Sequence, residues 1–144
     1  QQQQQQQSSQ PVRGVEAPSR DWMAEWLAAM HAHLHSISPN LAVQSLWGLR
    51  LLGCKPDPAW LADLEASVAA LAYHQLNHRQ QQQQQATLSL SATTGAATAS
   101  PADLNLWNAA GVLKGFGAFQ HSVQTSTVLL LLQAVLPQQQ QQQQ

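Results

Sequence analysis

Charge is scarce in this chain of 144 residues. Only 9% of its residues are charged and the formal net charge is −1, whereas a free-standing globular domain carries about 25% charged residues. So little charge is typical of a protein whose surfaces are partly covered by neighbouring structural units. It argues against a strongly basic nucleic-acid groove within this stretch, because phosphate binding depends on lysine and arginine.

Cysteine, long apolar runs and catalytic motifs are also missing or rare. The single cysteine, Cys54, excludes an internal disulfide and fits a small residue at a helix end. The run of large apolar residues from Val128 to Leu132 is far shorter than the ~20 residues that a membrane-spanning helix needs, so we expect no membrane segment. There is no glycine-rich phosphate loop, no nucleophile elbow and no carboxylate pair at a catalytic spacing. We therefore expect no enzyme activity and no cofactor.

Glutamine, by contrast, is abundant and clustered in three tracts, Gln1–Gln7, Gln80–Gln85 and Gln138–Gln144. Such tracts have no apolar face whose burial could offset the entropy lost on ordering. We therefore expect three disordered segments: 1–16, the Gln/Ser/Thr/Ala-rich insertion 77–99, and 138–144. The first residue is not methionine and both ends lie in glutamine tracts, so we expect an internal piece of a longer protein.

A repeat with a period of 38 relates two segments in the first half of the chain. The aligned residues are Pro18 with Pro56, Trp22 with Trp60, Trp26 with Leu64, Met30 with Val68, and Leu34 with Ala72. From the tryptophans onward the aligned positions are four apart, which is the step along one face of an α-helix. Ser19 and Asp57 are suitable N-caps, and Pro58 suits a first helical position. The pattern predicts one amphipathic helix at the start of each repeat.

The segment 38–53 predicts a second helix in the repeat. Ser38 is a suitable N-cap, Pro39 suits the first position, and Gly53 suits the left-handed residue that ends a helix. Apolar residues cover most of the helix circumference, except for a polar wedge made by Asn40, Gln44 and Gly48. Because such a helix must be covered on both flanks, we interpret it as the inner helix of a solenoid, packed on its own partner and on the next unit.

The second repeat continues after the insertion. The spacing from Ser100 to Gly115 equals the spacing from Ser38 to Gly53, so we expect a helix that begins near Ser100 and an insertion length of 24. The segment 121–136 predicts a third helix of the first kind. The predicted fold is therefore all-α: an α-solenoid of antiparallel helical pairs, with about two repeats of period 38 and a partial one. Its parts are 17–76 (repeat 1 and the first helix of repeat 2) and 100–137 (the second helix of repeat 2 and a terminal helix).

This pattern resembles the octotricopeptide repeat, known mainly from green algae, with relatives among FAST-kinase-like and RAP-domain proteins. The residues that carry the resemblance are Ser38, Pro39, Leu41, Ala42, Leu46, Trp47, Leu49, Leu52, Gly53, Pro56, Pro58, Trp60 and Leu61. It covers Pro18 to about Leu71 well and Ser100 to Gly115 loosely. The resemblance implies an α-solenoid that binds single-stranded organellar RNA and acts in maturation, stability, splicing or translation of chloroplast or mitochondrial transcripts.

Candidate RNA contacts come from the polar wedge and from scattered basic residues. Amide side chains can read the edges of unpaired bases, so Asn40 and Gln44 are the first candidates, although a solvated strip would have the same pattern. The remaining candidates are the counterparts Asn105 and Asn108, and the phosphate-binding Arg50, Lys55, Arg79 and Lys114.

The five tryptophans lie on apolar stripes, so we expect core packing rather than base stacking. We expect Trp47→Ala to unfold the array, at about 3–5 kcal/mol. The structural repeat signature consists of Trp22, Trp26, Leu46, Trp47, Gly53, Trp60, Leu64 and Trp107.

Two histidine pairs, His31 with His35 and His74 with His78, have the four-residue spacing of a helical metal site. We expect surface histidines and no bound metal, because no carboxylate or thiolate stands near either pair in the sequence. Two other functions stay open beside RNA binding: a solenoid scaffold that binds another protein, and a repeat segment next to a catalytic domain elsewhere in a longer chain.

Overall fold

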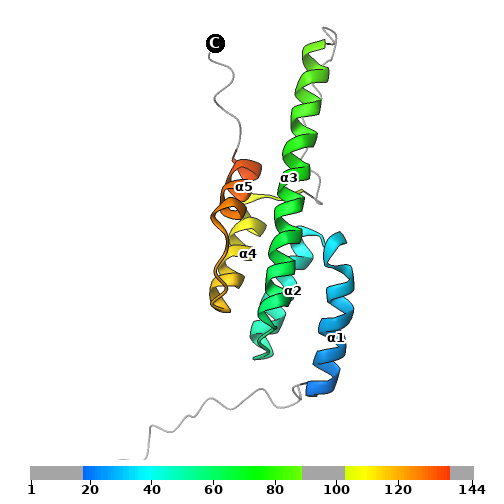
Figure 1. The fold of residues 1–144 in the computed structure, drawn as a ribbon. Coiled ribbons are helices and arrows are strands. Elements are labelled where there is room, and N and C mark those ends of the chain that lie inside the picture. The colour runs from blue at the N-terminus through cyan, green and yellow to red at the C-terminus, as the bar shows by residue number, and fades with distance from the viewer. Residues whose placement is uncertain (1–17, 89–102, 137–144) are drawn as a thin grey trace, which may run out of the picture.

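The computed structural model describes residues 18–88 and 103–136, and every regular element in these ranges is helical (Figure 1). The elements are α1 (Arg20–His33), the short 3₁₀ helix η1 (Leu34–Ser36), α2 (Pro39–Leu51), α3 (Pro58–Leu88), α4 (Leu106–Ala118) and α5 (Thr125–Val135). The all-α prediction is confirmed, and the segment 121–136 does contain a helix.

The helices pack in two layers. Helix α3 lies between α1 and α5 in the first layer (Figure 1), while α2 packs along α4 in the second. Asn40 near the start of α2 contacts Asn108 near the start of α4 at 3.5 Å, and Glu65 of α3 contacts Gln124 just before α5. Near the other end of α5, Arg79 of α3 contacts Ala134. Neighbouring helices within a layer therefore run parallel.

The predicted start and stop signals of the first helices are confirmed. The Ser19 and Ser38 hydroxyls accept hydrogen bonds from Trp22 N–H and Leu41 N–H, each at 3.2 Å, and α3 begins at Pro58. Gly53 has φ +64° and directly follows the C-cap of α2. The N–H of Cys54 bonds to Leu49 O and that of Gly53 to Arg50 O, which is the Schellman pattern.

The core lies between the two layers. Its largest fully buried side chains come from four helices and from the segment before α3: Phe116, Leu46, Leu49, Leu64, Leu131, Val68, Val112 and Pro56. Burying such apolar side chains contributes roughly 1.5–3 kcal/mol each, and this contribution holds the helix pairs together.

The predicted disorder of the second glutamine tract is wrong where the structure describes it. Helix α3 continues through Gln80–Gln85 to Leu88, so residues 77–88 are helical. Glutamine is a good helix former, and adding a residue to an existing helix costs far less than starting one. The segments 1–16 and 138–144 and the rest of the insertion lie outside the described residues.

The predicted register of the second repeat is also wrong. Residues 103–105 are not helical, and α4 begins at Leu106 with Asn105 as its N-cap. The step from the N-cap Ser38 to the N-cap Asn105 is 67, so the insertion length is 29 rather than 24. Asn105 forms a capping box with Asn108, which satisfies two backbone N–H groups at once.

This register changes which residues of the two repeats correspond to each other. Buried Leu49 now corresponds to buried Phe116, and Trp107 corresponds to Asn40 rather than to Trp47. Gly115 lies inside α4, and the left-handed residue after α4 is Gln120, with φ +56°. The burial pattern supports the step of 67 because matching positions face the same neighbours.

Core packing is confirmed for Trp60, which is 4% exposed, and Trp26 is half-buried against the core. It is wrong for Trp22, Trp47 and Trp107, which are 51%, 53% and 88% exposed. Trp60 is buried because α1 covers it: its indole N–H donates to Leu27 O at 3.2 Å. Trp22 is aligned with Trp60, but no described helix precedes α1, so the two indoles have unlike surroundings.

Candidate nucleic-acid interface

The pair formed by α2 and α4 depends on two glycines of α4. A Cβ atom on Gly111 would lie 3.0 Å from Val43 Cγ1, and one on Gly115 would lie 2.8 Å from the Cβ and Cδ1 of Leu46. Only glycine allows this close approach of the two helices. The helices therefore lie side by side. An apolar groove between them is lined by residues of both helices.

The rim of this groove carries one aromatic ring and two cations. Trp47 and Arg50 of α2 and Lys114 of α4 line it together with the apolar floor. The guanidinium carbon of Arg50 lies 5.9 Å from the centroid of the Trp47 ring, which is within the range of a cation–π interaction. Because half of the Trp47 surface is exposed, a broad π-face and two positive charges are available to a ligand at one place. We call Trp47, Arg50 and Lys114 the rim cluster.

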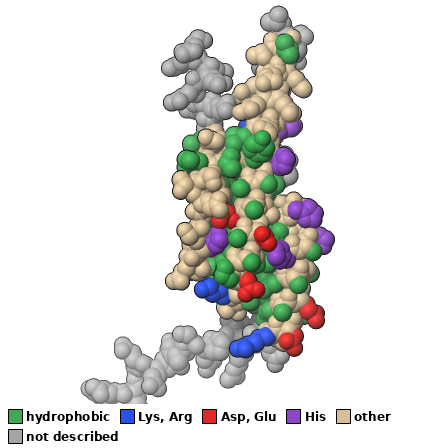
Figure 2. Space-filling model, in the orientation of Figure 1, with side chains coloured by type: hydrophobic (Ala, Val, Ile, Leu, Met, Phe, Trp, Pro, Cys, Tyr) green, Lys and Arg blue, Asp and Glu red, His purple; other side chains and the backbone are tan. Residues whose placement is uncertain are grey.

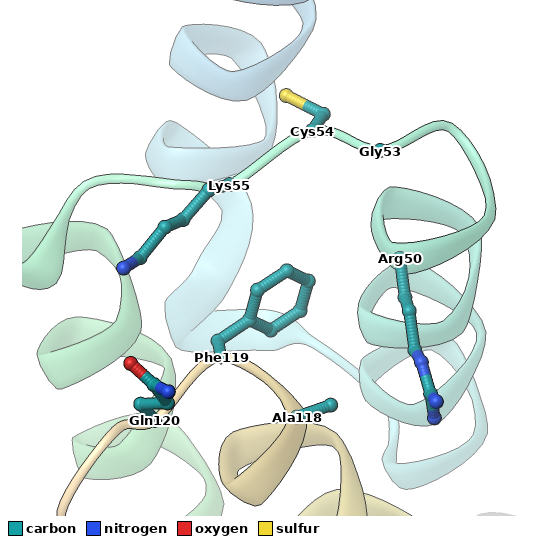
Figure 3. A pocket seen from close by; sticks show the side chains of 7 residues that line it. All are labelled: Arg50, Gly53, Cys54, Lys55, Ala118, Phe119 and Gln120. Atoms are coloured by element: carbon teal, nitrogen blue, oxygen red, sulfur yellow. The ribbon is translucent and has the colours of Figure 1, made fainter.

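A second hollow adjoins the rim cluster at the ends of α2 and α4. Its lining includes Arg50, Lys55 and Phe119, and Figure 3 shows the two cationic side chains on opposite sides of the Phe119 ring. Gly53 and Gln120, the residues with positive φ that follow the two helices, also line this hollow. Three of the candidate phosphate contacts thus line adjoining hollows.

The carboxylates on helices are confined to one layer. Helices α2 and α4 contain Arg50 and Lys114 but no aspartate or glutamate. The carboxylates on helices belong to α1 and α3, and Figure 2 shows them on the face formed by that layer, together with histidines. The α2–α4 layer is therefore the better surface for a polyanion, although the net charge of the chain is −1.

Some of the predicted RNA contacts are exposed, and others form hydrogen bonds within the protein. Asn40 and Gln44 are exposed on α2, as the wedge prediction requires. Asn105 and Asn108 bond to each other in the capping box, and Asn108 is buried, so their amides have a structural role. Arg79 is half-buried and donates to Ala134 O at 2.6 Å, which ties it to the end of α5.

Trp47 is the functional candidate that sequence reasoning assigned to the core. The available signal was its position seven residues after Asn40, which places both residues on the same face of α2 as Gln44. The neighbouring leucines outweighed that signal in the sequence, because a tryptophan between leucines usually marks a core stripe.

A buried polar cluster joins α3 to the segment before α5, and nothing in the sequence indicated it. Glu65 is buried, and one of its oxygens accepts from Gln124 N–H at 2.8 Å and from the Thr127 hydroxyl at 2.9 Å. The other oxygen lies 2.6 Å from Nε2 of His121. Burial alone would raise the pKa of Glu65, but the contacts with Gln124, His121 and Thr127 outweigh it and hold the pKa below its usual value.

One histidine of the predicted pairs contacts a carboxylate from another helix. His31 pairs with Asp63 of α3, a carboxylate 32 positions away. Within residues 18–88 and 103–136, no three His, Cys, Asp or Glu side chains lie close enough to hold a metal ion. None of the helices described is both long and apolar enough to cross a membrane.

Comparison of the chain with protein-family models, with curated proteins and with solved structures finds no match.

Proposed function

We propose that this chain is a helical-repeat segment of an RNA-binding protein and that the α2–α4 layer is its RNA-binding face. The observation that carries the proposal is the rim cluster, in which an exposed indole, a guanidinium and an ammonium group line one groove. Single-stranded nucleic acids bind to such combinations, because bases stack on the aromatic ring and phosphates pair with the cations.

The packed helix pairs and the absence of carboxylates on α2 and α4 also support this face. Asn40 and Gln44 continue the same face of α2 away from the cations, where their amides could read base edges. The solenoid architecture, an organellar location and a role in post-transcriptional control come from the resemblance to the octotricopeptide repeat and form part of the proposal.

The test is a titration of the purified chain with a fluorescently labelled pool of random single-stranded RNA at several salt concentrations. Three phosphate contacts, from Arg50, Lys55 and Lys114, predict a slope of about −2 in a plot of log Kobs against log salt concentration, since each phosphate contributes about −0.7 for single strands. The double variant Arg50→Ala/Lys114→Ala should reduce this slope to about −0.7.

Trp47→Ala should weaken RNA binding by about 5- to 150-fold, equivalent to the loss of about 1–3 kcal/mol from one stacked base, without changing the salt slope. The chain should stay folded, because this indole is half exposed; this replaces the prediction that the variant unfolds. Tyr73→Ala is the matched control, since Tyr73 is an equally exposed aromatic residue on α3, outside the proposed face. A flat salt response, or equal binding by the Trp47 and Tyr73 variants, would refute the proposal.

A protein-binding scaffold is the second candidate. The observation that favours it is a set of exposed large apolar side chains on both sides of the helical stack, including Trp22, Leu41, Leu129 and Leu132. Such side chains suit a protein partner better than a polyanion. Failure to retain any RNA, combined with self-association or capture of a defined protein, would favour this function.

A further inference from the structure

The first layer repeats one contact between successive helices. Trp60 of α3 donates its indole N–H to the backbone of Leu27 on α1. Thr127 of α5 donates its hydroxyl to the side chain of Glu65 on α3 at 2.9 Å. The step between the two acceptors, Leu27 and Glu65, is 38, which is the period of the repeat. The step between the two donors, Trp60 and Thr127, is 67, which is the step between the caps. Corresponding positions therefore meet at both helix–helix contacts, although the acceptor is a backbone carbonyl at the first and a side-chain carboxylate at the second.

The same register identifies two residues without such a partner among the described helices. Trp22 corresponds to Trp60 and is half exposed on α1. Leu132 corresponds to Glu65 by the step of 67 and is exposed on α5, next to exposed Leu129. One end of the layer thus presents the indole, and the other end presents the surface on which an indole at that position would pack.

The two ends of the second layer carry a glycine and a leucine that correspond to the pair in contact between α2 and α4. Gly115 of α4 receives Leu46 of α2, and the residues that correspond to them by the step of 67 are Gly48 of α2 and Leu113 of α4. A Cβ atom on Gly48 would meet nothing within 4 Å. Exposed Leu41 lies on the same face of α2 as this glycine, and exposed Leu52 at the C-cap of α2 follows on that side. α2 therefore carries a glycine in the position that receives a leucine at the α2–α4 contact, but none of the described helices occupies it.

We propose that this chain associates head-to-tail with a second copy of itself. The head is the surface formed by Trp22 of α1 and by Leu41, Gly48 and Leu52 of α2. The tail is the surface formed by Leu129 and Leu132 of α5 and by Leu113 of α4. The two copies meet in the same register as successive helices within one chain. The tail of the second copy therefore contacts the head of the first, and Trp22 of the first copy packs on Leu132 of the second.

Such a contact joins two different surfaces, so it leaves a free head and a free tail and can continue into a chain of copies. It also leaves the rim cluster of each copy uncovered, because the α2–α4 groove lies between the two ends. The inference does not depend on RNA binding.

Sedimentation velocity of the full chain at increasing protein concentration tests this proposal. The wild type should show a mass that rises above the monomer. Trp22→Ala should remove the head and Leu132→Glu the tail, so each variant alone should sediment as a monomer. An equimolar mixture of the two should form a 1:1 dimer and nothing larger, because only one intact head and one intact tail can meet.

Two further variants distinguish a loss of association from a loss of folding. Gly48→Leu fills the vacant position on the head, at a site where a Cβ atom meets nothing within 4 Å. Its tail is intact, so it should pair with the Leu132→Glu variant but not with the Trp22→Ala variant. Trp47→Ala removes an indole as exposed as Trp22 and should keep the wild-type mass. Circular dichroism should show equal helix content in all the variants.

A monomeric wild type at every concentration would overturn the proposal. So would a Trp22→Ala variant that associates like the wild type, or a mixture of head and tail variants that stays monomeric. RNA titration of the Trp22→Ala monomer separates this result from the function proposed above, since its rim cluster is intact.

Discussion

Two single residues, Gln120 and Gly53, end their helices in the same way. Both have a positive φ, 56° and 64°, and both are followed by a residue whose N–H returns to the last turn, His121 to Phe116 O and Cys54 to Leu49 O. Glycine adopts this conformation without steric penalty, whereas a side chain with a Cβ atom is strained there. Gln120 therefore occupies a position that favours glycine.

Replacing Gln120 by glycine should raise the free energy of unfolding by about 1 kcal/mol, because it removes this strain at a position where the side chain is exposed. Urea unfolding followed by circular dichroism measures the change in midpoint. Gly53→Ala is the reciprocal control and should lower stability by about 1 kcal/mol or more. A lower midpoint for Gln120→Gly would show that its side chain contributes more than its backbone costs.

Between helices, the contact of α2 with α4 depends on which glycines of α4 face α2. Gly115 leaves no room for a Cβ atom beside Leu46, whereas a Cβ atom on Gly117 would meet nothing within 4 Å. Both glycines lie inside α4, so they have the same helix propensity and differ only in their neighbours. Substitutions at these two glycines therefore distinguish the effect of helix packing on stability from the effect of helix propensity.

Gly115→Ala should destabilise the chain by about 1–3 kcal/mol, because the clash with the base of the Leu46 side chain forces the helices apart. Gly117→Ala should stabilise it by up to about 1 kcal/mol, which is the propensity difference between the two residues in an exposed helix. Thermal unfolding of the two variants measures these opposite changes in stability. Similar effects of both substitutions would contradict the close packing of α2 on α4.

Across the full chain, Glu65 links parts of the first layer that are distant in the sequence. It holds His121, Gln124 and Thr127, which lie 56 to 62 positions away. A carboxylate that accepts several hydrogen bonds in a buried place favours its charged form. The folded state therefore lowers the pKa of Glu65 relative to the unfolded chain.

This shift makes the chain less stable in acid. The contribution of Glu65 is complete above its unfolded pKa, about 4.3, and is lost as the pH falls through the lower pKa of the folded state. Glu65→Gln should lower the free energy of unfolding at neutral pH by about 1–3 kcal/mol, because the charged acceptor is lost. The variant should also lose less stability than the wild type on acidification.

Urea unfolding at neutral and at acid pH measures both effects. Glu25→Gln is the control, since Glu25 is an exposed carboxylate on α1, and its stability should follow the wild type at each pH. A Glu65→Gln variant with the acid sensitivity of the wild type would show that other groups cause it.

The sequence predicted the helices where local signals were strong and complete. Ser19, Ser38 and Gly53 identified their helix ends correctly, since caps act through neighbouring backbone groups. The prediction for the second repeat was wrong because Ser100-Pro101 resembled the earlier start, while the capping box at Asn105 and Asn108 determined the actual one.

The all-helical class, the first three helix starts and the period of 38 follow from the amino-acid order alone, because propensity, caps and periodicity act over a few residues. Packing determines which indoles are covered, since Trp22 and Trp60 have the same local pattern and differ only in the helix beside them. Packing also determines the partners of Glu65 and the rim cluster, because each joins residues from helices that are distant in the sequence. Whether a side chain is buried depends on which helices lie beside it. The sequence pattern of a helix specifies only which of its faces can pack against a neighbouring helix.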